Sequence, residues 1–274
     1  MNLKNRLYQL CTWVIHAMTA WNTGGENIHS PYLFEWVRMI MYDTHAYYSW
    51  ADIEQCRCAM LESSKALTYV DYGCGKRTHT MTSQRMVRDI AQTSLEPSIY
   101  AQLLFRLVNW MGHQAREQHN DSLYIVELGT SLGITTAYLA SADSRNQIVT
   151  FEGCHEVAEE AHANWEKLQL HNIQCVEGDI DVTLQDNLPA VVDIAFIDAN
   201  HTYEATMRYF NTILHHIHNK SVVVIDDIYH SPEMRRAWGE VCRCNAVTTT
   251  MDIWRMGIVF FDANYLHKQY KLRL

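Results

Sequence analysis

From residue 120 onward, short apolar runs rich in β-branched residues alternate with segments of helical spacing. The runs lie at 123–128, 147–151, 173–176, 191–197 and 220–226, and the helical segments at 133–143, 154–168, 203–217 and 231–243. This alternation predicts a parallel sheet with helices on both faces. Two further strand candidates, 247–252 and 256–262, follow with a short turn between them, which predicts an antiparallel hairpin at the sheet edge.

Residues 1–119 follow a different pattern, with mainly helical spacing. In the first segment, apolar positions recur on one face of a predicted amphipathic helix: Leu7, Leu10, Val14, Ile15 and Met18. Ser30-Pro31 is typical of a helix start, and 98–117 again has helical spacing. We therefore expect a helical N-terminal region over 1–119, covering the cleft and setting substrate choice, and a second domain over 120–274.

Composition narrows the class of protein. The net charge of −9 argues against a nucleic-acid binder, because such binding requires clustered Lys and Arg. The chain contains no run of about 18 apolar residues that could span a bilayer. The eight cysteines lack the C-x-x-C spacing of zinc sites and are expected to be reduced thiols. We expect a cytoplasmic protein without nucleic-acid or membrane partners.

Two stretches compete as a cofactor loop, since both place an acid and glycines after an apolar run. YVDYGCGKRTHT at 69–80 is followed by a segment of helical pattern, with no acid-ended strand at the right distance. YIVELGTSLGITT at 124–136 leads into a helix, and the next strand ends at Glu152. A strand-ending acid at this distance suits the two hydroxyls of a ribose. The second stretch is therefore the better candidate. The first is interpreted as a structural turn, whose Lys76 and Arg77 can line a substrate entrance.

The segment ELGTSLGITTAYLA resembles the first motif of class I S-adenosylmethionine-dependent methyltransferases, especially the catechol and caffeoyl-CoA O-methyltransferase-like group. The resemblance covers about 120–274 and implies a Rossmann-like α/β fold with a mostly parallel, seven-stranded sheet. It also implies the cofactor-binding residues, which are Glu127, Gly129, Thr130, Ser131, Gly133, Glu152 and Asp179. Of these, Glu127 either orients the loop or faces the ammonium group of the cofactor. Asp179 lies by the adenine or is simply a solvated turn residue.

Three acids end two strands that should be neighbours in the sheet: Asp198 ends one, and Asp226 and Asp227 end the next. Converging carboxylates repel one another unless they are protonated, hydrogen-bonded or bound to a cation, and an all-oxygen set suits Mg²⁺, Ca²⁺ or Mn²⁺. The spacing is similar to that of metal-dependent O-methyltransferases, in which an Asp and an Asp-Asn pair hold Mg²⁺. Here the pair is Asp-Asp. The alternative is that Asp198 and Asp227 are helix caps.

His201 follows Asp198 by three residues, at the position where the catechol-type enzymes carry a lysine that accepts the substrate proton. A histidine can act as that base at neutral pH, and it can also be a metal ligand or face solvent. His230 is a weaker candidate for the same cleft.

The sequence thus predicts an enzyme that moves the methyl group of S-adenosylmethionine to a hydroxyl of a small-molecule acceptor. Asp198 and His201 would be catalytic, and a cation bound by Asp198, Asp226 and Asp227 would assist. A metal-independent methyltransferase acting on nitrogen or on a protein, and a non-catalytic cofactor-binding module, remain alternatives. A homodimer is compatible with the sequence.

Overall fold

The computed structural model describes residues 3–20, 28, 30–71, 81–119, 122–265 and 267–274. The chain divides into two compact units. One unit comprises Met1–Tyr42 together with Ala190–Leu274, and the other comprises Asp43–Pro189. The boundary of the sequence-based division at 119/120 therefore lies inside the second unit.

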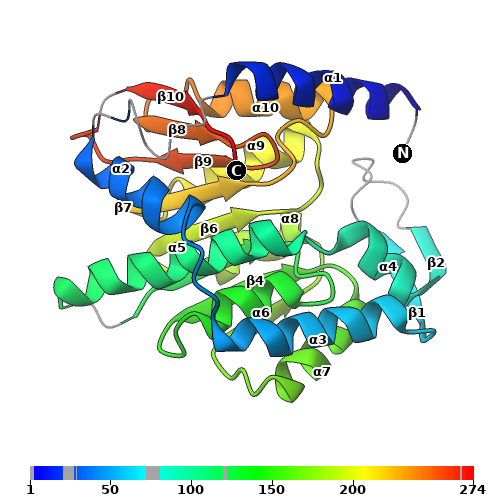
Figure 1. Ribbon diagram of the computed structural model, residues 1–274. Helices are drawn as coiled ribbons and strands as arrows, with labels where there is room; N and C mark the ends of the chain where they lie inside the picture. The colour runs from blue at the N-terminus through cyan, green and yellow to red at the C-terminus, as the bar shows by residue number, and fades with distance from the viewer. Residues whose placement is uncertain (1–2, 21–27, 29, 72–80, 120–121, 266) are drawn as a thin grey trace. The chain divides into compact units, whose positions relative to one another are not determined.

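The first unit joins the N-terminal helices to the last five strands (Figure 1). Its elements are α1 (Leu3–Thr19), α2 (Pro31–Trp36), the π-helical turn η1 (Val37–Met41), β6 (Val192–Ile197), α9 (Tyr203–Ile213), β7 (Ile217–Ile225), α10 (Pro232–Val241), β8 (Thr249–Asp252), β9 (Gly257–Phe260) and β10 (Lys268–Lys271). The strand order is β10-β8-β9-β7-β6. Strands β6 and β7 are parallel, and β9 is antiparallel to both β7 and β8.

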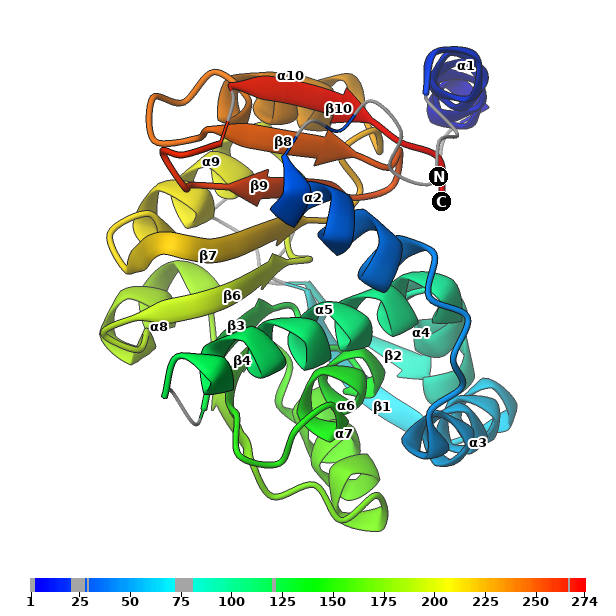
Figure 2. The same cartoon turned by 60° about the vertical axis from the view of Figure 1, so that its left-hand side comes forward.

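Helices cover this group of strands on both faces, as Figure 2 shows, with α2 crossing one face and α9 and α10 on the other. Trp36 is fully buried, and its ring packs edge-on against Phe260 of β9. On α10, Trp238 packs so closely on β9 that a Cβ at Gly257 would lie 2.4 Å from its ring. Because both faces are covered, every residue of β6 is buried, which explains its uninterrupted apolar sequence.

The second unit contains α3 (Tyr48–Glu62), β1 (Ala66–Asp71), β2 (Met81–Met86), α4 (Val87–Ser94), α5 (Ser98–Glu117), β3 (Tyr124–Leu128), α6 (Ile134–Ser141), β4 (Gln147–Glu152), α7 (His155–Lys167), β5 (Ile173–Glu177) and α8 (Ile180–Asn187). Strands β3, β4 and β5 are parallel neighbours, with Glu127 opposite Thr150 and Glu152 opposite Glu177. Parallel registry brings the acids at the carboxyl ends of β4 and β5 to one edge.

Most predicted elements are confirmed within one to three residues at each end. Helix α5 has the predicted bounds at 98–117, and Ser30 caps α2 by accepting a hydrogen bond from the N–H of Leu33. The antiparallel hairpin is formed by β8 and β9. The α/β class and the mostly parallel arrangement are confirmed.

Three local expectations are wrong, and one helix was not predicted. Residues 81–86 form β2, paired with β1, although a helical pattern was predicted from Ser83 onward. Helix α8 was not predicted, and α9 ends at Ile213 because β7 begins at Ile217, opposite Val192. Among the described residues, eight strands lie outside the β1–β2 pair, one more than the seven expected, because β10 pairs with β8. The 72–80 part of the first glycine stretch lies outside the described residues.

Within the described residues, no helix is both long and apolar enough to cross a membrane.

Candidate active site

The loop that connects β3 to α6 has a backbone that few residues can adopt. Gly129 has φ 98°, Ser131 has φ 48° and Gly133 has φ 76°. The N–H groups of Gly129 and Thr130 both donate to the carbonyl of Phe151 on β4, at 3.1 Å each. The loop is therefore folded against the end of the neighbouring strand, as a cofactor loop at this edge requires.

Gly133 permits a close approach of α7 to the start of α6. Trp165 Nε1 donates to the Gly133 carbonyl at 2.8 Å. A Cβ atom at Gly133 would lie 2.6 Å from that nitrogen and 2.8 Å from the Cβ of Ala161. The glycine is thus required by its positive φ and by the packing beneath it.

Glu127 lies under the loop, fully buried. Its Oε2 accepts hydrogen bonds from the hydroxyls of Thr136 at 2.5 Å and Thr150 at 2.7 Å. Burial outweighs these hydrogen bonds and raises the pKa of the Glu127 carboxyl to about 7. Its Oε1 is buried and has no hydrogen-bond partner among the described residues. Of the two predicted roles, the contacts support orientation of the loop, since Glu127 ties β3, β4 and α6 together.

Glu152 joins the loop to the end of β4. Its Oε2 accepts from the N–H of Ser131 at 2.8 Å, and its Oε1 accepts from the N–H of Cys154 at 2.9 Å. Burial raises the pKa of this carboxyl, although the backbone hydrogen bonds oppose the shift. The side chain is only partly buried, and a carboxylate can accept more hydrogen bonds than these backbone N–H groups donate. Such a fixed, two-oxygen acceptor fits the two hydroxyls of a ribose.

Asp179 caps α8, because its side chain accepts from the N–H of Asp181 at 2.9 Å. This local role accounts for an acid at the position. Its predicted proximity to adenine stays a prediction.

In the first unit, the sequence-predicted acids follow β6 and β7. The N–H of Asp226 donates to the carbonyl of Ile197 at 2.9 Å, and oxygens of Asp198 and Asp226 lie within 4.8 Å of each other. The alternative that Asp198 and Asp227 cap helices is wrong. Thr202 accepts from Ala205 N–H to cap α9, and Ser231 accepts from Met234 N–H to cap α10.

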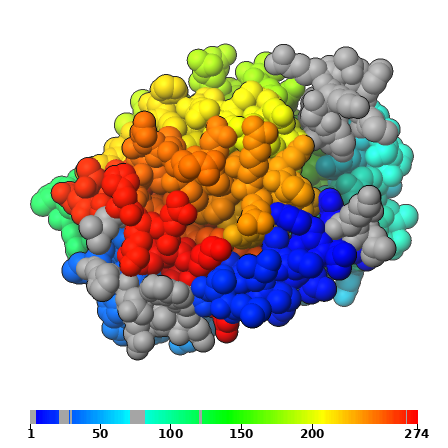
Figure 3. Space-filling view, turned by 90° about the horizontal axis from the view of Figure 1, so that it is seen from above, coloured from blue at the N-terminus to red at the C-terminus, as the bar shows by residue number. Residues whose placement is uncertain are grey.

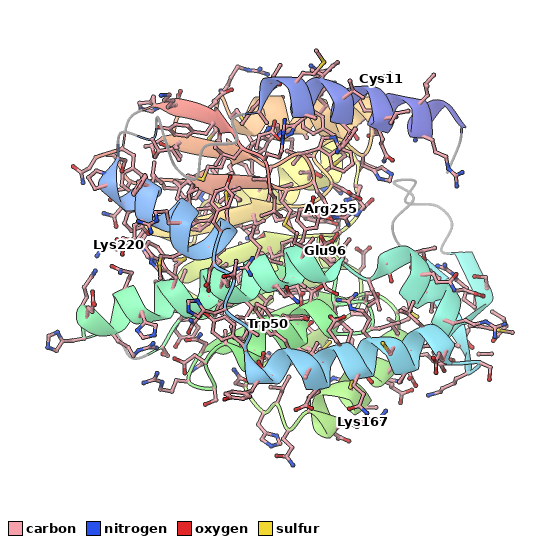
Figure 4. All side chains as sticks on the ribbon, in the orientation of Figure 1. Cys11, Trp50, Glu96, Lys167, Lys220 and Arg255 are labelled. Atoms are coloured by element: carbon pink, nitrogen blue, oxygen red, sulfur yellow. The ribbon has the colours of Figure 1, made fainter. Side chains whose placement is uncertain are left out.

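Arg255, which was not predicted from the sequence, is labelled in Figure 4 and lies in the turn between β8 and β9. Its guanidinium lies 3.0 Å from Oδ2 of Asp226, which is 0% exposed, and 3.5 Å from Oδ1 of Asp227. Its carbonyl accepts from the N–H of Ile228, which fixes this turn to the chain after β7. Arg255 thus supplies a positive charge where the sequence argument placed a metal ion.

Two histidines complete the cluster. His230 Nδ1 lies 3.3 Å from Asp227 Oδ2, and the rings of His201 and His230 stack with centroids 5.5 Å apart. Burial raises the pKa of Asp227, but the hydrogen bond from His230 and the charge of Arg255 outweigh it and lower the pKa to about 2. The same hydrogen bond raises the pKa of His230.

His201 differs from His230 in its electrostatics. Its Nε2 lies 3.4 Å from Asp198 Oδ1, and 29% of its side chain is exposed. Burial lowers the pKa of His201, and it outweighs the negative charge of Asp227, which raises the pKa; the positive charges of His230 and Arg255 act in the same direction as burial. A neutral histidine that is partly exposed can accept a proton from a bound ligand.

The acids fit a divalent cation only in part. Asp198 and Asp226 approach as two oxygen ligands would. Asp227 instead has a φ of 51°, and its carboxylate contacts His230 and Arg255. The structure therefore places Asp198 next to His201, the two residues predicted to be catalytic. Asp226 and Asp227, both predicted to be metal ligands, each contact the guanidinium of Arg255.

The fold is shared with solved methyltransferases. The O-methyltransferase from Bacillus cereus in complex with SAH has a TM-score of 0.53 and 18% identity, over 79% of this chain and 92% of that chain. The O-methyltransferase TomG from Streptomyces achromogenes, involved in tomaymycin synthesis and solved with SAM, has a TM-score of 0.51 and 21% identity, over 62% and 82%. The SAH-bound methyltransferase from Podospora anserina has a TM-score of 0.55 and 12% identity, over 85% and 97%.

The sequence itself also matches a known domain. Residues 126–228 match the family model described as a methyltransferase domain. This match spans β3 to the loop after β7, and so includes the loop at 129–133 and the acids after β6 and β7. The resemblance to class I methyltransferases is confirmed. A search of the curated proteins gave no match.

Proposed function

We propose that this chain is an S-adenosylmethionine-dependent methyltransferase that acts on a hydroxyl oxygen of a small molecule. The observation that carries the proposal is the loop after β3, folded onto Glu152 by the Ser131 N–H and matched by a methyltransferase-domain model. Solved proteins of the same fold are described as O-methyltransferases in complex with SAM or SAH.

Gly129–Gly133 would hold the cofactor, with Glu152 binding the ribose hydroxyls and Asp179 lying by the adenine. Bound there, the cofactor supplies an electrophilic methyl group on a sulfonium. His201 would accept the proton of the acceptor hydroxyl as the oxygen forms its new bond to carbon, and Asp198 would hold the imidazole in place. Alignment of the acceptor can contribute roughly 7–11 kcal/mol, so positioning should exceed the contribution of the base.

A divalent cation stays a prediction. Asp198 and Asp226 would hold it, and it would lower the pKa of the acceptor hydroxyl. The contacts of Arg255 favour a second candidate, a methyltransferase without a metal ion, in which the guanidinium neutralises Asp226 and Asp227. A chelator separates the two, since it should abolish turnover in the first case and leave it unchanged in the second.

Calorimetric titration with S-adenosylmethionine tests the cofactor site. Glu152→Ala should weaken binding by at least tenfold, because two ribose hydroxyls would lose a charged acceptor. Glu159→Ala is the matched control, since Glu159 lies on α7 with a side chain 63% exposed and should leave the affinity unchanged. Equal affinities for wild type and Glu152→Ala would contradict the ribose assignment.

Turnover on a panel of hydroxyl acceptors tests the reaction. Methylation of oxygen that depends on His201 would support the proposal. Binding of S-adenosylmethionine without turnover on oxygen, nitrogen or protein acceptors would indicate the non-catalytic module instead.

A further inference from the structure

The face of the first unit that is formed by α10, β8 and β10 carries two adjoining hollows. The first has a volume of about 170 Å³ and the second about 370 Å³, and both are lined by Cys242, Thr250 and Gln269. Figure 3 shows this face, on which the orange surface around α10 adjoins the red surface of the C-terminal residues. Together the hollows reach the size of sites that hold small molecules.

Three cationic side chains border the first hollow. Arg235 and Gly239 lie one turn apart on α10, and Arg243 lies one turn further, just past the end of the helix. The third cation, Lys271, comes from β10, where it is paired opposite Asp252 of β8. The helix and the strand therefore bring positive charge to the hollow from two sides.

These cations are not neutralised by the protein. Within the part of the chain that the structure describes, Arg235, Arg243 and Lys271 form no ion pair and no side-chain hydrogen bond. The chain as a whole carries a net charge of −9. A concave group of three cations on such a chain attracts an anionic ligand.

Asp252 also lines the first hollow, but its carboxylate has other partners. Its Oδ2 accepts from the hydroxyl of Tyr229 at 2.6 Å. Its Oδ1 accepts from the N–H of Trp254 at 2.9 Å and lies 3.2 Å from His16 Nε2. Both oxygens are thus engaged, and the cations stay available to a ligand.

Gly239 leaves space in the lining of the first hollow. A glycine in the interior of a helix destabilises that helix relative to alanine. The backbone here is helical, and among the described atoms a Cβ at Gly239 would meet only the guanidinium of Arg243, at an ordinary 3.5 Å. Neither backbone conformation nor packing therefore requires glycine, and its missing side chain keeps the hollow open beside a guanidinium.

The arrangement of charge fits a phosphate monoester better than a carboxylate. A phosphate group is tetrahedral and doubly charged, so cations on two sides of it can each contact an oxygen, and guanidinium groups bind such oxygens in pairs. A carboxylate is planar and carries one charge. The second hollow, which Val247, Thr248 and His267 also line, has room for the organic part of the ligand.

We propose that the two hollows bind a small phosphate monoester. Its phosphate lies among the three cations of the first hollow, and its organic part lies against Val247 and Thr248 in the second. This site is independent of the proposed methyl transfer, because none of its residues is assigned to that reaction.

Calorimetric titration with phenyl phosphate tests the site. The wild type should bind, and Arg235→Gln and Arg243→Gln should each weaken binding at least fivefold, because each removes a charge-assisted hydrogen bond. Arg236→Gln is the matched control. Arg236 is the neighbour of Arg235 on α10, but its guanidinium lies over the ring of Tyr203, 4.0 Å from the centroid, so this variant should keep the affinity of the wild type. No binding by the wild type, or an equal loss in Arg235→Gln and Arg236→Gln, overturns the proposal.

Two further titrations test the ligand class and the position. Benzoate has the same ring and one charge fewer, so it should bind at least tenfold more weakly, and an affinity equal to that of phenyl phosphate overturns the phosphate assignment. Gly239→Leu fills the space beside Arg243 and should abolish binding with an unchanged circular dichroism spectrum. An unchanged affinity in this variant overturns the placement.

Alkylation of cysteines locates the bound ligand. Cys242 lines both hollows, whereas Cys244, also partly exposed, is not among their described lining residues. Burial raises the pKa of the Cys242 thiol to about 11, so the reaction with N-ethylmaleimide is followed at alkaline pH by peptide mass spectrometry. Saturating phenyl phosphate should slow alkylation of Cys242 roughly fivefold or more and leave Cys244 unchanged. Equal rates at Cys242 with and without phenyl phosphate overturn the location.

Discussion

Replacement of Gly133 by alanine tests whether the loop after β3 depends on one backbone conformation. Gly133 has φ +76°, and a new Cβ would lie 2.6 Å from Trp165 Nε1 and 2.8 Å from Ala161 Cβ. Both neighbours are buried, and Ala161 is 0% exposed. Neither can move aside without displacing α7 from the start of α6.

The expected cost follows from these contacts. The left-handed conformation costs an alanine about 1–2 kcal/mol, and overpacking adds about 1–3 kcal/mol. Alanine also lowers the conformational entropy of the unfolded chain, which offsets about 0.4–1 kcal/mol of this destabilisation. Gly133→Ala should therefore lower the free energy of unfolding by about 1–5 kcal/mol.

Urea unfolding followed by tryptophan fluorescence and circular dichroism measures this change. The control is Gly239→Ala in α10, where a new Cβ would find Arg243 Nη1 at 3.5 Å, an ordinary contact. Because glycine weakens a helix interior, this substitution should raise the free energy of unfolding by about 0.5–1 kcal/mol. A Gly133→Ala protein as stable as the wild type would refute the packing argument.

Two further predictions concern the buried acid and the base. The pKa of Glu127 is raised from 4.5 to about 7 in the folded protein, so the folded state is favoured while the carboxyl is protonated. This contribution to the free energy of unfolding is lost as the pH rises from about 4.5 to about 7. Between pH 4.5 and 8 the wild type should therefore lose about 3 kcal/mol relative to Glu127→Gln in urea unfolding, and parallel profiles would contradict the buried-acid assignment. His201→Gln should lower kcat by roughly 10²–10⁴-fold with little change in S-adenosylmethionine affinity in calorimetry. Equal loss of both would indicate a structural role.

The strands and helices that the sequence predicted well are those with strong apolar periodicity. Strand β6 is buried at every position, and helix α5 is buried all round in its middle, where 103–108 are buried in succession, so each leaves a clear apolar run. Strand β2, with the sequence MTSQRM, has no apolar alternation, because it is held by backbone pairing to β1. A single sequence carries little signal for such pairing.

The candidate site was predictable where residues follow the strands in sequence. Gly129, Gly133 and Glu152 belong to one short strand–loop–helix–strand segment, and Asp198 and Asp226 end consecutive strands. Arg255 is 29 residues from Asp226 in a turn without a motif, and only the fold brings its guanidinium to that acid. The hydroxyls that hold Glu127 were likewise not recognisable, since threonine is common on strands and helices.

The main-chain conformation of Asp227 bears on one difference noted from the sequence. This chain has an Asp-Asp pair after β7, whereas the metal-dependent O-methyltransferases that it resembles have an Asp-Asn pair. Its φ of 51° belongs to a region that asparagine, aspartate and glycine enter more readily than other residues. An acid and its amide can therefore interchange here without reshaping the main chain. The main-chain conformation at residue 227 is thus compatible with either charge.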